Sequence, residues 1–112
     1  MSLTVRVIDC TYGRPVAGMP VRLERDVGRA WIEQVRSQTD DEGRLADWLP
    51  DPLARGVYRL EFDLDGYFAS RGIAAFYPSI TIVFRIADPN RAPCIPLLIT
   101  SNAFMTYRQD LL

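Results

Sequence analysis

The sequence contains no histidine and no lysine, so all thirteen of its basic residues are arginine. Without lysine, the chain has neither a Schiff-base residue nor a lysine general base. Without histidine, it has no Ser-His or Cys-His pair and no side chain with an unperturbed pKa near neutrality. Any proton transfer must therefore fall to a carboxylate or thiol with a perturbed pKa, a tyrosine or a bound water.

Composition also argues against several other classes of function. Cys, Asp and Glu are the side chains left as metal ligands, and they are scattered rather than clustered at zinc-like spacing, so we expect no metal and no cofactor. A formal net charge of -1 without a basic block argues against nucleic acid as the main partner. No apolar run approaches the ~18 residues of a membrane span, and Met1 to Asp9 lacks a signal-peptide layout. We therefore expect no membrane partner and a cytoplasmic protein, with free thiols at Cys10 and Cys94.

Hydrophobic periodicity predicts the fold class. A chain of 112 residues is long enough for one core, and we expect one domain over residues 1–112. Asp65 is expected to cap a short helix over 66–71 that Gly72 ends, and Gly43 is available for a positive φ. Alternation of apolar and polar residues predicts strands over residues 3–9, 21–25, 30–38, 45–49, 57–63, 80–86 and 94–99, with the one at 45–49 a short strand. The pattern is typical of an all-β, two-sheet antiparallel sandwich with one short helix.

The run from Pro96 to Asp110 is unusual for a chain end, which normally frays unless something ties it down. Its pattern predicts two short strands joined by a polar turn at 100–102. Apolar residues would dock the terminus and bring Tyr107 and Arg108 into the folded body. The alternative is an ordinary closing hairpin with an exposed arginine.

Several segments, in their order and spacing, together resemble one family. They are Val7-Ile8-Asp9 with Gly13 to Leu23, Thr39-Asp40 with Gly43-Arg44, Tyr58 to Phe62, Tyr67-Phe68, Arg71-Gly72, Phe76-Tyr77-Pro78, and Pro96-Leu97-Leu98 with Thr106-Tyr107-Arg108. Over almost its whole length the chain resembles the transthyretin-like 5-hydroxyisourate hydrolases of purine catabolism. The Tyr107-Arg108 ending is similar to the hydrolase branch rather than to the hormone-carrying transthyretins.

The resemblance implies a transthyretin-like (prealbumin-like) sandwich that assembles as a homotetramer, a dimer of dimers, with active sites in channels at the dimer–dimer face. It implies two histidines, one arginine and a tail serine around the substrate ring and a hydrolytic water. The arginine falls on Arg44, and the two histidines fall on Arg6 and Cys94. The tail glycine and serine fall on Gln109 and Asp110. The chain thus keeps the arginine and lacks the catalytic histidines.

Arginine cannot replace a histidine base, because it stays protonated throughout the accessible pH range. It can instead donate hydrogen bonds to a carboxylate or a developing oxyanion. If Arg6, Arg44 and Arg108 converge, they form an anion site. The alternative is that they pair with carboxylates such as Asp9 or Asp110.

Two residues are candidates for moving the proton. The alternation of Cys94 with apolar neighbours favours a buried, inert thiol, whereas a nearby Arg6 would lower its pKa and favour a thiolate nucleophile. Asp110 could act as a general base if the pocket raised its pKa, or could be a solvated carboxylate.

The sequence leaves three functions open, and with them whether the chain is an enzyme. The first is a diverged enzyme that opens a ring, closes a ring or moves a proton on a small cyclic anionic substrate. The second is true 5-hydroxyisourate hydrolysis with a remodelled site, and the third is a non-catalytic small-molecule-binding tetramer. For the first function the predicted catalytic residues are Arg6, Arg44, Cys94 and Asp110, and the predicted substrate-binding residues are Tyr107 and Arg108.

Overall fold

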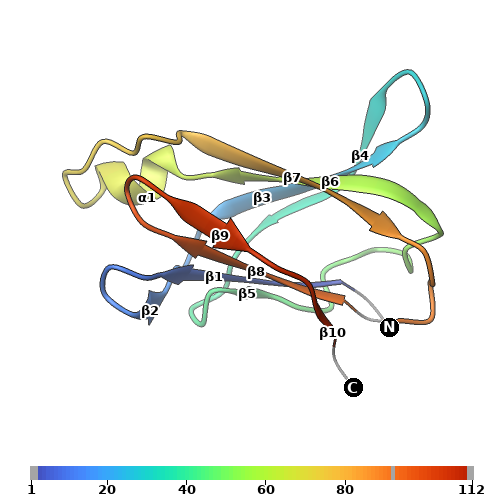
Figure 1. The fold of residues 1–112 in the computed structure, drawn as a ribbon, viewed down its shortest axis with the longest axis horizontal. Helices are drawn as coiled ribbons and strands as arrows, with labels where there is room; N and C mark the ends of the chain where they lie inside the picture. The colour runs from blue at the N-terminus through green and yellow to red at the C-terminus, as the bar shows by residue number, and fades with distance from the viewer. Residues whose placement is uncertain (1–2, 92, 111–112) are drawn as a thin grey trace.

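The computed structural model describes residues 3–91 and 93–110, which form a sandwich of two sheets (Figure 1). The helix α1 (Asp65–Ala69) lies at one end of the sandwich and precedes β7. The strands are β1 (Thr4–Asp9), β2 (Arg14–Pro15), β3 (Pro20–Asp26), β4 (Trp31–Gln38), β5 (Arg44–Leu45), β6 (Gly56–Asp63), β7 (Ser79–Ile86), β8 (Pro93–Ile99), β9 (Phe104–Thr106) and β10 (Gln109–Asp110). The predicted all-β sandwich with one short helix is confirmed.

The two sheets divide the chain unevenly. One has the order β10-β8-β1-β2, with β5 also pairing with β1 and β9 with β8. The other has the order β4-β3-β6-β7. The pairings between described strands are antiparallel except that of β1 with β8, which is parallel. This parallel pair places β1, near the start of the chain, beside β8 in the middle of the first sheet.

The core lies between the facing sides of the sheets and is built by alternation along each strand. In β1, Val5 and Val7 are fully buried, while Thr4 and Arg6, which alternate with them, are partly exposed. The other core residues of the central strands include Leu23, Leu60, Phe62, Leu97 and Ile99, each fully buried. Because successive side chains of a strand point to opposite faces, Arg6 is directed out of the sandwich.

The helix begins one residue before its predicted start and ends at Ala69, two residues before its predicted end, although Gly72 has the role in its termination that the sequence predicted. Asp65 is the first helical residue and not the cap, since Leu64 holds the N-cap position and no side chain bonds there. Gly72 has a φ of 70° and donates its N–H to the carbonyl of Ala69 at 3.0 Å. Ile73 donates to the carbonyl of Phe68 at 2.9 Å, which completes a Schellman-type pair of hydrogen bonds with the predicted glycine in the left-handed position.

The short strand expected at 45–49 is limited to Arg44 and Leu45. Asp47 takes a left-handed conformation with φ 51°, which ends the pairing with β1. Trp48 then turns back, and its indole N–H donates to the carbonyl of Leu3 at 3.0 Å. In the part of the chain that the structure describes, no helix is long and apolar enough to cross a membrane.

Candidate functional site

Arg6 and Arg44 lie directly opposite each other on the outward face of the first sheet. They are register partners in the antiparallel pair of β1 with β5. In such a pair, opposite Cβ atoms are about 4.5–5.5 Å apart, and like charges there are destabilising. Two guanidiniums in this position attract an anion, and neither β1 nor β5 supplies a carboxylate that pairs with them.

Neither guanidinium is well neutralised by the rest of the described chain. Arg6 makes no ion pair with residues 3–91 or 93–110, and its Nε is buried without a hydrogen-bond acceptor. Arg44 has one loose partner, Glu42, at 3.9 Å, and both of these side chains are largely solvated. An ion pair with this geometry contributes about 0–1 kcal/mol, so it does not satisfy Arg44. The alternative pairing of Arg6 with Asp9 is wrong, because the Asp9 carboxylate is buried on the other face.

The turn that precedes β5 fixes the backbone of Arg44. One carboxylate oxygen of Asp40 accepts the N–H groups of Glu42 and Arg44, each at 2.9 Å. Gly43 has a φ of 74°, as its place in the turn predicted, and its carbonyl accepts the N–H of Val7 at 2.8 Å. A Cβ at position 43 would lie 2.6 Å from the carbonyl oxygen of Val7, so a larger residue cannot enter without moving β1.

Cys94 lies on the same face, because it is the register partner of Thr4 in the parallel pair and Thr4 points the same way as Arg6. The thiol is almost completely buried. Burial raises the pKa of Cys94, and the fields of Arg6 and Arg44 lower it by a smaller amount. Of the two alternatives for Cys94, the structure favours the buried, protonated thiol over the thiolate, because desolvation outweighs the two charges.

The last strand contributes Gln109, and not Asp110, to this face. Gln109 is the register partner of Cys94, and Asp110 is that of Pro93. Asp110 therefore projects to the opposite side of β10, where its oxygens accept bonds from Arg108 at 2.8 and 3.1 Å and from Arg91 at 3.3 Å. The hydrogen bond and charge of Arg108 lower the pKa of Asp110, whereas a base role required a raised pKa.

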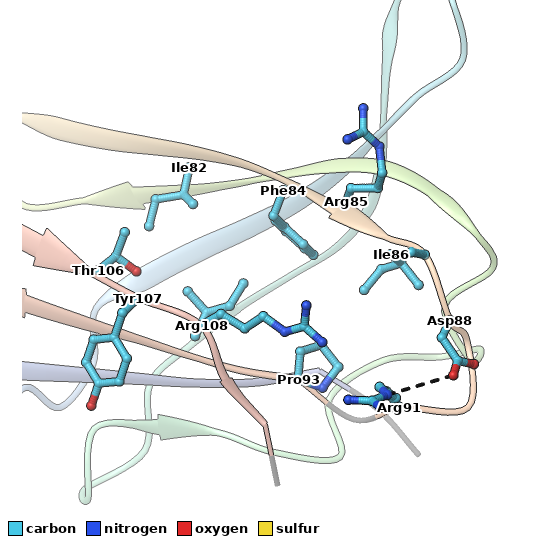
Figure 2. Close-up of a pocket in the computed structure, with 12 residues that line it drawn as sticks. Ile82, Phe84, Arg85, Ile86, Asp88, Arg91, Pro93, Thr106, Tyr107 and Arg108 are labelled. Carbon is cyan, nitrogen blue, oxygen red and sulfur yellow. Dashed lines mark ion pairs between the residues drawn. The ribbon is translucent and has the colours of Figure 1, made fainter.

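Tyr107 and Arg108 belong to a different place, a cavity of about 460 Å³ at the open edge between the sheets (Figure 2). Apolar side chains of β7, with Pro93 and Ile95 of β8, form most of its wall. In Figure 2 the hydroxyl end of Tyr107 points away from Ile82 and Phe84. Tyr107 is 49% exposed, and the Arg108 side chain is 67% exposed. The expectation that the terminus would bring Tyr107 and Arg108 into the folded body is wrong. Both residues directly precede β10, which is an edge strand of the first sheet, and their side chains are exposed there.

The predicted site residues are thus divided between two places. Arg6, Arg44 and Cys94 share one outward face, which we call the arginine face, together with Gln109. Arg108 and Asp110 pair with each other beside the edge cavity. Gln109 was missed because its role depends on the register of β10 against β8, for which the sequence carries no local signal. Among the described residues no three Cys, Asp or Glu side chains gather as a metal-binding group.

The arginine face can bind and polarise an anion but carries no obvious base. Guanidinium N–H groups donate to carboxylates or to an oxygen on which negative charge develops. A protonated thiol is at most a weak hydrogen-bond donor. The chemistry that these groups favour is stabilisation of negative charge on a bound ligand.

Known proteins resemble this chain over nearly its full length. The model of a family described as HIUase/Transthyretin matches residues 3–109. The 5-hydroxyisourate hydrolase of Mus musculus is 35% identical over 109 residues, which cover 95% of this chain and 92% of the mouse protein. The structure of Klebsiella pneumoniae 5-hydroxyisourate hydrolase superposes with a TM-score of 0.84 at 28% identity, covering 96% of this chain and 97% of that one. Transthyretin from Sparus aurata has a TM-score of 0.91 at 21% identity, covering 98% and 97%, which is a likeness of fold.

Proposed function

Because this chain belongs to the HIUase/Transthyretin family, we propose that it is a 5-hydroxyisourate hydrolase-like protein whose diverged site acts on a small cyclic anionic substrate. The observation that carries the proposal is the pairing of Arg6 with Arg44 on an outward face. These two guanidiniums lack a close carboxylate among the described residues. An anionic ring would relieve their repulsion and satisfy the buried Nε of Arg6.

The reaction we propose is ring opening by water, or its reverse. Water attacks a ring carbonyl carbon, the new C–O bond forms, and the carbonyl oxygen gains negative charge. Arg6 and Arg44 donate hydrogen bonds to that oxygen or to the anionic group of the substrate. The ring C–N bond then breaks, and the leaving nitrogen takes up the proton that the attacking water has released. Gln109 is placed beside Cys94 to hydrogen-bond a ring amide.

Cys94 and Asp110 take different parts in this proposal from those that the sequence indicated. A thiol with a raised pKa stays protonated near neutral pH, so Cys94 lies beside the substrate as a weak donor. Asp110 holds β10 in place through Arg108 and Arg91 and acts on the site only by positioning Gln109. Tyr107 and Arg108 would then reach substrate only through assembly of several chains.

The proposal includes a cytoplasmic homotetramer in which the arginine face lines a channel between two dimers. Strand β7 pairs only with β6 among the described strands, and β9 pairs only with β8. Exposed apolar side chains, including Val83 and Met105, lie on these edges. Open edges with apolar residues favour pairing with another copy. Sedimentation that shows a monomer at micromolar concentration would contradict this part of the proposal.

The test of the function uses freshly generated 5-hydroxyisourate, whose ultraviolet decay is followed with and without the protein. Each imidazole that handles a proton typically contributes ~10²–10⁴-fold in rate. We therefore expect hydrolysis to be much slower than with a histidine-bearing relative such as the mouse protein, or absent. A rate equal to that of the relative would show that the arginine face performs the ancestral reaction unaided, which is the second candidate function and is favoured by the 35% identity.

The non-catalytic candidate is favoured by a different observation. On the arginine face, burial raises the pKa of Cys94, and Asp110, whose pKa is lowered by Arg108, projects away from that face. If the protein binds ring anions tightly yet accelerates neither opening nor closure of any of them, the binding function is the correct one. Calorimetric binding combined with the ultraviolet assay separates the two.

A further inference from the structure

A second cavity, of about 490 Å³, lies at the helix end of the sandwich, away from the arginine face. Its walls come from the loop around β2 and from the end of α1, which are at the same end of the molecule in Figure 1. Two guanidiniums, those of Arg14 and Arg71, border it together with the hydroxyl-bearing residue Ser70. None of the residues that line it is Asp or Glu.

Arg71 is held at the rim by an aromatic platform that is itself anchored. Its guanidinium carbon lies 4.0 Å from the centre of the Tyr67 ring. The Tyr67 hydroxyl donates to a carboxylate oxygen of Asp9 at 2.6 Å, and the other oxygen accepts the N–H of Thr11 at 2.9 Å. Burial, with the hydrogen bond and charge of Asp9, raises the pKa of Tyr67 to about 12, so the ring stays neutral. The chain of contacts fixes Arg71 before any ligand arrives.

Arg14 approaches from the opposite wall. It is the register partner of Asp9 in the pair of β1 with β2, so its side chain leaves the sheet on the side where Tyr67 lies. Its guanidinium carbon is 5.6 Å from the centre of the Tyr12 ring, a second cation–π contact. Both arginines are close enough to Tyr67 for their charges to act on its phenol.

The positive charge at this cavity is not cancelled by a direct partner. Neither Arg14 nor Arg71 forms an ion pair within residues 3–91 and 93–110. Asp9 is 1% exposed, and both of its oxygens already accept hydrogen bonds on the far side of Tyr67. Its charge therefore offsets part of the field without occupying the cavity.

We propose that this cavity, which we call the Arg14–Arg71 cavity, binds a phosphate group, either as the free ion or as part of a phosphomonoester. Guanidinium forks from two sides match the several oxygens of a tetrahedral oxyanion. Ser70 supports the site indirectly, since its hydroxyl donates to the carbonyl of Tyr67 at 2.7 Å and its oxygen accepts an N–H of Arg71 at 3.4 Å. Pro15, Met19 and Pro20 give an apolar wall against which an organic group can lie. The site is independent of the ring chemistry proposed for the arginine face.

Titration of the full-length protein with inorganic phosphate, followed by backbone amide NMR, tests this proposal. Saturable shifts are expected in residues 13–20 and 66–72, which separates the cavity from Arg6 and Arg44. Arg71→Gln and Arg14→Gln should each raise the dissociation constant by at least about tenfold, the effect of losing a hydrogen bond to a charged group. Arg71→Lys keeps the charge but loses the fork, and should give a smaller increase.

Arg29→Gln is the matched control, because Arg29 is exposed in the turn between β3 and β4 and loses the same charge. It should leave the dissociation constant within about twofold, and so should Arg44→Met. A parallel titration with glycerol 3-phosphate identifies the source: tighter binding than phosphate indicates a phosphomonoester, and equal binding indicates the free ion. The proposal is overturned if millimolar phosphate gives no saturable shifts in these segments, or if Arg29→Gln weakens binding as much as Arg71→Gln.

Discussion

Arg44→Met removes one of the two guanidiniums on the arginine face and keeps a long, unbranched side chain. The backbone of position 44 is fixed by Asp40 and by the Gly43 turn, so the substitution leaves the path of β5 unchanged. What is lost is a charged donor directed at an anion. A hydrogen bond to a charged group contributes about 1.5–3 kcal/mol, which corresponds to roughly 10- to 160-fold in affinity.

The same substitution should leave folding stability almost unchanged. Removing Arg44 relieves repulsion with Arg6, a like-charged cross-strand pair that costs roughly 0.2–1 kcal/mol. It also removes the loose contact with Glu42 at 3.9 Å, which contributes about 0–1 kcal/mol. The two effects oppose each other. A loss of binding without a loss of melting temperature therefore identifies Arg44 as a ligand-binding residue rather than a structural one.

Isothermal titration calorimetry with orotate, a cyclic amide that carries a carboxylate, measures the effect. Arg29→Met is the control, because it removes the same charge from an exposed turn. Arg22 is unsuitable for this purpose, since it pairs with Glu61 at 2.7 Å and its loss would disturb the other sheet. If Arg44→Met and Arg29→Met change affinity equally, or if neither changes it, the shared anion site of Arg6 and Arg44 is refuted.

Three further predictions follow from the same geometry. Cys94, with its raised pKa and buried sulfur, should resist iodoacetamide in the folded protein while exposed Cys10 is alkylated, and mass spectrometry showing equal rates would contradict this. Gly43→Ala should lower the free energy of unfolding by at least about 1–2 kcal/mol in urea, because a left-handed φ and a backbone oxygen at 2.6 Å both oppose a Cβ. The pKa of Asp110 is lowered by Arg108, so its stabilisation is present above its ordinary pKa and is lost as pH falls through the lowered value. Asp110→Asn should therefore make the melting temperature less sensitive to pH below about pH 4, and an unchanged pH profile would count against the Arg108 pair.

Strand periodicity was enough to predict much of the fold. The alternation of Val5 and Val7 with Arg6 predicted which side of β1 is buried, because side chains of one strand point to opposite faces with a period of two. The residue type also predicted the turn at Gly43 and the end of the helix at Gly72, because glycine adopts a positive φ without steric cost. These features depend on neighbours within a few residues, so they can be predicted from the sequence.

The resemblance to a family located most of the arginine face but not its chemistry. The resemblance implied that Arg6, Arg44 and Cys94 belong to one site, and the structure places the three on one face. The sign of the pKa shift of Cys94 depended on a balance between burial and two nearby charges. The alternation of Cys94 with apolar neighbours had favoured burial, but the size of the burial effect relative to the two charges depends on the packing around β8, which the sequence pattern does not specify.

The tail shows what only the tertiary structure decided. Gln109 and Asp110 are adjacent in sequence, and one of them had to face Cys94 while the other faced away. Pairing of Gln109 with Cys94 directs Asp110 to the opposite side, where Arg108 and Arg91 hold it. A shift of one residue in that register would exchange the positions of Gln109 and Asp110, because such a shift moves every side chain of a strand to the opposite face. The sequence determined the faces within each strand, whereas long-range pairing of β10 with β8 determined which residue of the tail reaches the site.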